Sequence, residues 1–100
     1  MSRNSRKKTD MSGFDSICEV LCRIRREDQM RSFLEEILTP AERKDLSLRW
    51  QLMEMLQVGV PQRKIAADLG ISLCKITRGA KILKDDQSVS KRYLEPRRRT

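Results

Sequence analysis

The sequence predicts an all-α fold, a small domain of about six helices that contains a helix-turn-helix and forms an intertwined homodimer. Apolar residues recur at helical spacing along most of the chain, and no alternating run indicates a strand. The 100 residues are enough for one domain. The first helices carry more apolar surface than a monomer of this size covers easily, which favours a dimer.

The N-terminal part contains a basic arm followed by two amphipathic helices. Residues 1–12 are polar and basic without periodicity, which predicts a disordered arm, and the helical domain is expected to span residues 13–95. Helical spacing of apolar residues predicts a first helix from Phe14 to about Glu27 and a shorter second helix over roughly 29–38.

A helix start signal follows at Thr39. Thr39 is suited to cap a helix whose first residue is Pro40, and Glu42 is placed to bond back to the cap. The helix is near 18 residues long and should end at Gly59, a natural residue for a left-handed position. Its apolar residues, with the tryptophan interpreted as core, are Leu46, Trp50, Met53 and Leu56.

Two short helices come next. Pro61 begins the first and Gly70 ends it. Ser72 caps the second, which is expected to run over residues 73–84. The turn between the two helices is therefore only a few residues long.

A last helix is expected around residues 89–94, before Pro96 and a basic tail over residues 96–100. The sequence holds 22 Lys and Arg against 14 Asp and Glu, a net charge of +8. The excess of positive charge lies in both terminal segments and in residues 61–90, while the charges of residues 11–60 are nearly balanced. This uneven distribution is typical of proteins that bind a polyanion.

Composition excludes several classes of function. The sequence has no histidine, so the commonest general base and the commonest metal ligand are absent, and we expect neither an enzyme nor a metal site. Cys18, Cys22 and Cys74 lie in apolar helical patterns, which indicates buried thiols in a reducing compartment. No apolar run approaches the ~20 residues of a membrane span. We therefore expect a cytoplasmic protein without a membrane partner.

The strongest motif is a helix-turn-helix at residues 62–81. Such a unit needs a small residue at its fifth position, where the helices cross, and a glycine at its ninth, in the turn. Ala66 and Gly70 occupy these positions. Apolar residues occupy the four positions that face the core: Ile65, Leu69, Ile71 and Ile76. Basic residues fall on the outer face of the second helix, which favours DNA binding over an ordinary helical hairpin.

Gly79 breaks the pattern, because a branched apolar residue is usual at this position of the motif. A glycine within a helix costs ~1 kcal/mol relative to alanine. One interpretation is that a flat small molecule lies against the helix backbone at Gly79, in which case Gly79→Val would abolish ligand binding while the unliganded dimer gains a little stability. The other interpretation is a tolerated flaw or close helix packing.

The stretch from Leu38 to Lys84 resembles the tryptophan repressors of bacteria. The segments that carry the resemblance are "LTPAER", "QRKIAADLG" and "ITRG", the last at residues 76–79, together with Arg49 and Gly59. The resemblance implies L-tryptophan as corepressor, with the indole held between two guanidinium planes and the carboxylate paired with one of them. The matching ligand-binding residues are Thr39 of the partner subunit, Arg49, Arg78 and Gly79.

The chain also departs from the family pattern. Ile82 corresponds to a serine that the family places near the ligand amino group, and Ala80 and Lys81 stand where a Ser-Asn pair is common. The resemblance carries the DNA contacts over to Gln62, Arg63, Leu73, Cys74, Lys75, Thr77 and Lys84. Arg63 is expected to read a base edge, because arginine bound to guanine is the commonest specific contact in the major groove.

The sequence thus predicts an L-tryptophan-dependent transcriptional repressor that binds palindromic, double-stranded operator DNA as a homodimer. One alternative is a helix-turn-helix protein that responds to another indole or to no ligand. A second alternative is a protein-docking helical module. Steep salt dependence of DNA binding separates both DNA-binding functions from the docking module.

Overall fold

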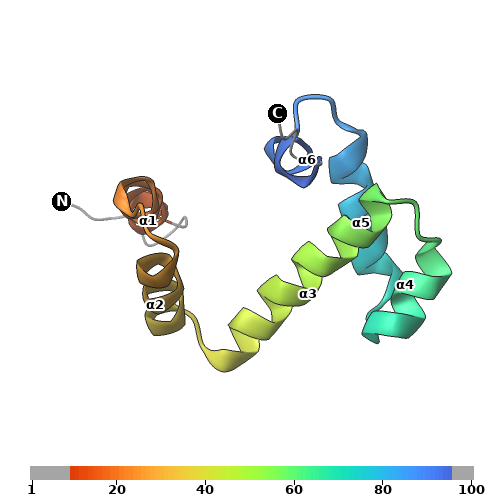
Figure 1. Ribbon diagram of the computed structural model, residues 1–100, viewed down its shortest axis with the longest axis horizontal. Helices are drawn as coiled ribbons and strands as arrows, with labels where there is room; N and C mark the ends of the chain where they lie inside the picture. Colours follow the sequence, from red (N-terminus) through yellow and green to blue (C-terminus); the bar gives the residue numbers. More distant parts are fainter. Residues whose placement is uncertain (1–9, 96–100) are drawn as a thin grey trace. The chain divides into compact units, whose positions relative to one another are not determined.

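The computed structural model of the chain describes residues 10–95 and contains six helices, with no strand in that part of the chain (Figure 1). This confirms the predicted all-α fold. The basic tail predicted over residues 96–100 and most of the predicted arm lie outside the described residues. The structure divides into two compact units at the boundary between Thr39 and Pro40.

The first unit contains α1 (Ser12–Arg23) and α2 (Glu27–Ile37). The expectation that the first helix runs to about Glu27 is wrong, because Ile24 adopts an extended conformation after Arg23. Acidic residues at the first positions of α2 favour a new helix start there, since they complement the positive end of the helix dipole. A hydrogen bond from the Arg26 guanidinium lowers the pKa of Asp28 in that turn.

Neither helix of the first unit buries a residue within the single chain. Phe14 is 58 % exposed and Ile37 is 47 % exposed, although both lie in strongly amphipathic helices. The expectation of buried cysteines is also wrong, because Cys18, Cys22 and Cys74 are all exposed. Cys18 and Cys22 are spaced for the apolar face of α1, but among residues 10–95 that face is not buried.

The second unit contains α3 (Pro40–Gln57), α4 (Gln62–Leu69), α5 (Leu73–Lys84) and α6 (Val89–Leu94). These bounds confirm the four helices expected after Thr39. Gly59 and Gly70 both adopt left-handed conformations after α3 and α4, with φ of 91° and 65°. The Ser72 hydroxyl accepts a hydrogen bond from the Lys75 backbone N–H at 3.4 Å, as expected for the cap of α5.

The core of the second unit consists of four side chains from α3, α4 and α5: Leu52, Met53, Ile65 and Ile76. Trp50 is 39 % exposed, so its interpretation as a core residue is wrong for the single chain. Side chains two positions apart on an α-helix point about 200° away from each other around its axis. Trp50 therefore lies nearly opposite the buried Leu52. Trp50 and the exposed Leu46 form a second apolar surface on α3.

No helix among the described residues is long and apolar enough to cross a membrane.

Candidate functional site

The helices α4 and α5 form the predicted helix-turn-helix and pack against α3 (Figure 1). Ile65 of α4 and Ile76 of α5 are completely buried. The Gly70 backbone N–H donates to the Ala66 carbonyl at 2.9 Å and closes α4 just before the turn. The positions that the motif assigns to the core and to the turn therefore have these roles in the structure.

The outer face of the motif is polar and basic. All seven residues that the sequence assigns to DNA contact are exposed: Gln62, Arg63, Leu73, Cys74, Lys75, Thr77 and Lys84. Lys64, which was not assigned to DNA, forms an ion pair with Asp68 at 3.1 Å. No ion pair engages Arg63, Lys75 or Lys84 within residues 10–95, so these cations are available to phosphates or bases.

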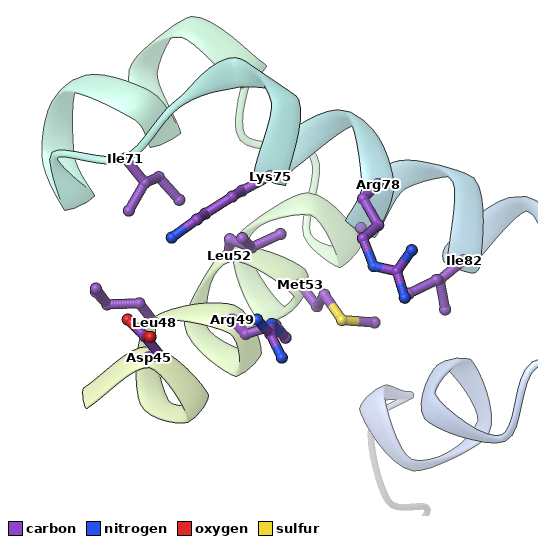
Figure 2. Close-up of a pocket in the computed structure, with 10 residues that line it drawn as sticks. Asp45, Leu48, Arg49, Leu52, Met53, Ile71, Lys75, Arg78 and Ile82 are labelled. Carbon is purple, nitrogen blue, oxygen red and sulfur yellow. The ribbon is translucent and has the colours of Figure 1, made fainter. Parts of the chain in front are cut away.

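A pocket lies between α3 and α5 (Figure 2). Three of the four predicted ligand-binding residues, Arg49, Arg78 and Gly79, line this pocket. Arg78 extends from α5 toward α3, and Arg49 lines the pocket from α3 (Figure 2). The fourth, Thr39, belongs to the first unit and does not line the pocket.

The charged groups of the pocket are Arg49, Lys75 and Arg78, with Asp45 as the single carboxylate among its lining residues. Within residues 10–95, none of these four side chains forms an ion pair or a side-chain hydrogen bond. Three cations against one anion make the pocket electropositive, and its remaining lining side chains are apolar. Such a pocket suits an aromatic ligand that carries a carboxylate.

Gly79 is buried against α3. The space beside its backbone is therefore filled by side chains of α3, and is not left empty for a ligand as one interpretation of the sequence assumed. A Cβ atom on residue 79 would lie 2.5 Å from Leu52 Cδ1 and 3.3 Å from Met53 Cγ. Close helix packing therefore accounts for the glycine, although Gly79 also lines the pocket. The stability gain expected from Gly79→Val would require Leu52 to move aside, because its terminal methyl group is the first atom that a Cβ on residue 79 meets.

Sequence reasoning missed Asp45 and Leu48 as lining residues and assigned Lys75 to DNA alone. A signal for the first two was available, because positions 45, 48, 49 and 52 follow the i, i+3, i+4, i+7 spacing of one helix face. Ile82 lines the same pocket, in agreement with the position that the family resemblance gave it. At the pocket Ile82 offers neither a donor nor an acceptor.

Comparisons with known proteins point to one family. The family model described as Trp repressor protein matches residues 12–97. A Trp operon repressor homolog of Xylella fastidiosa (strain M23) is 40 % identical over 74 residues, which cover 73 % of this chain and 80 % of the relative. A homolog of the same name from Chlamydia trachomatis serovar L2 is 29 % identical over 90 residues, which cover 89 % of this chain and 96 % of the relative. No solved structure matches the chain.

Proposed function

Because the chain belongs to the Trp repressor family, whose members are tryptophan-dependent transcriptional repressors, we propose that its pocket binds L-tryptophan and that its helix-turn-helix binds operator DNA. The observation that carries this proposal is the convergence of Arg49 and Arg78 on one pocket from two different helices. A guanidinium pairs with a carboxylate through two parallel hydrogen bonds and also stacks on an aromatic ring.

The ligand is proposed to act by linking two helices. Arg49 belongs to α3, which contributes Leu52 and Met53 to the core, whereas Arg78 belongs to α5, the second helix of the DNA-binding motif. A ligand held by both side chains fixes the tilt of α5 against α3. The ligand shifts the equilibrium between different orientations of α5 only by the difference in its affinity for them, typically ~1–3 kcal/mol.

Homodimerisation is the second part of the proposal. The apolar faces of α1 and α2, and the surface formed by Leu46 and Trp50, are exposed among residues 10–95, and such faces usually mark an interaction site. In the proposed dimer a second copy covers them, and Thr39 of the partner subunit contacts the ligand carboxylate. Two reading helices then enter successive major grooves about 34 Å apart on a palindromic site.

The DNA-contacting residues are those that the family resemblance implies, and the chemistry of two of them indicates their roles. Arg63, at the start of α4, is proposed to read a base edge, and Lys84 to neutralise a phosphate. The exposed residues Gln62, Leu73, Cys74, Lys75 and Thr77 complete the interface.

Two measurements test the proposed function. Calorimetric titration with L-tryptophan tests the pocket without interference from the fluorescence of Trp50. Selection of duplexes from a random pool, with and without L-tryptophan, tests the DNA-binding function and supplies a cognate sequence. We expect ligand-dependent recovery of palindromic duplexes and steep salt dependence of their binding. Duplex binding that is indifferent to both L-tryptophan and salt would contradict the proposal.

A further inference from the structure

One side of the pocket carries a carboxylate and a guanidinium on the same helix. Asp45 and Arg49 are four residues apart on α3, so they are neighbours on one face, with Cβ atoms about 5–6 Å apart. Both line the pocket, and no ion pair joins them in the structure. They therefore present two opposite charges to whatever occupies the pocket.

This pair matches the charges of an α-amino acid, which carries an ammonium and a carboxylate on one carbon atom. Arg49 and Arg78 supply partners for the carboxylate, but the ammonium needs an acceptor when it leaves water. Ile82, on α5, has no polar side-chain atom to offer. Among the side chains that line the pocket, only Asp45 carries a negative charge.

We propose that Asp45 is a specificity-determining residue, which accepts the α-ammonium of the ligand while Arg49, one turn further along α3, binds its carboxylate. This inference rests on the proposed function of the pocket. It makes Asp45 the group that distinguishes an amino acid from the corresponding deaminated acid. Asp45 is exposed without a ligand, so the size of this distinction depends on how far the bound ligand shields the pair from water.

Lys75 is the competing partner of Asp45. It comes from α5 and lies with Asp45, Leu48 and Ile71 toward the same end of the pocket (Figure 2). If Asp45 served only to hold Lys75, its removal would affect every ligand of the pocket alike. The ammonium role instead predicts an effect on amino acids alone, and this difference separates the two roles.

The test compares Asp45→Asn with the intact chain, using L-tryptophan and indole-3-propionate in calorimetric titrations. The second compound keeps the indole and the carboxylate but lacks the ammonium. Glu54→Gln is the matched control, because Glu54 is an exposed acid on the same helix that does not line the pocket. Asp45 is exposed too, so circular dichroism should show the same helicity for all three proteins.

We expect Asp45→Asn to weaken L-tryptophan binding about 10- to 100-fold, which corresponds to the loss of one charge-assisted hydrogen bond. Binding of indole-3-propionate should be unchanged or tighter, because the variant removes an anion near its carboxylate. Glu54→Gln should leave both affinities unchanged. Equal weakening of both ligands by Asp45→Asn, or no effect on either, would overturn the role of Asp45 while the proposed function stands. If the intact chain binds neither compound, the proposed function fails, and this inference with it.

Discussion

Gly79 of α5 lies so close to Leu52 of α3 that a Cβ atom on residue 79 would stand 2.5 Å from Leu52 Cδ1. Real Cβ atoms essentially never make contacts this short, so one of the two helices or the leucine side chain would have to move. Leu52 is only 2 % exposed and belongs to the core, which limits where it can go. The glycine therefore sets the distance between the helices that form the pocket.

Gly79→Val is expected to destabilise the protein. Overpacking of a filled core costs ~1–3 kcal/mol, and the higher helix propensity of valine offsets only part of this cost. Urea denaturation followed by circular dichroism measures the loss in free energy of unfolding. The same variant should lose L-tryptophan binding, because residue 79 and Leu52 both line the pocket and the new side chain must displace Leu52 or α5 there.

Two further variants check that the cause is the contact with Leu52. Gly13→Ala, in α1, places a Cβ in open space and should leave stability unchanged or raise it slightly. Leu52→Val removes the atom that the new Cβ meets, so in combination with Gly79→Ala it should cost less than the two single substitutions together. A stability gain in Gly79→Val would show that the space is open after all.

Arg78→Leu should weaken L-tryptophan binding by roughly 1.5–3 kcal/mol, because a charge-assisted pair and one stacking surface are lost. Arg78 is exposed and has no ion pair among residues 10–95, so helicity should be retained. Arg92→Leu is the control, since this exposed arginine on α6 does not line the pocket. Calorimetry that finds equal affinities for both variants would remove Arg78 from the ligand site.

Ile76→Ala and Leu73→Ala should separate stability from DNA binding within one helix. Ile76 is completely buried, and its truncation should cost ~2–5 kcal/mol of unfolding free energy. Ile76→Val, at ~0.5–1.5 kcal/mol, provides a measurable variant if alanine prevents folding. Leu73 is 50 % exposed, so alanine there should change stability by less than ~0.5 kcal/mol while reducing duplex binding. A stable Ile76→Ala protein would contradict the observed core.

Arg63→Ala and Lys84→Ala should weaken DNA binding in different ways. Loss of a base contact at Arg63 should cost ~1–3 kcal/mol on the cognate duplex and little on a scrambled one. Loss of a phosphate contact at Lys84 should weaken both duplexes alike and lower the salt slope by about one counterion per subunit. Binding isotherms at several salt concentrations, with L-tryptophan saturating, distinguish these patterns. If Arg63→Ala weakens both duplexes equally, Arg63 does not read a base.

Local signals in the sequence were sufficient for the helices of the second unit. Pro40 and Pro61, the glycines at 59 and 70 and the cap at Ser72 each act within a few residues, and the observed bounds of α3 and α4 and the start of α5 follow them. The helix-turn-helix was equally predictable, since its core positions have a fixed spacing. The end of α1 was not predictable in this way, because its apolar spacing continues past Arg23 without a glycine or proline to stop it.

Only the tertiary structure decided which face of α3 packs against the helix-turn-helix. The sequence does not say that Leu52, rather than Trp50, meets α5, because both lie in an apolar stretch of α3 and the choice depends on how the helices cross. The same crossing brings Asp45 and Lys75 to the pocket and fills the space beside Gly79. A pattern along one helix records the chemistry of its side chains, whereas contact between two helices depends on their separation and angle, which arise from packing of the whole core.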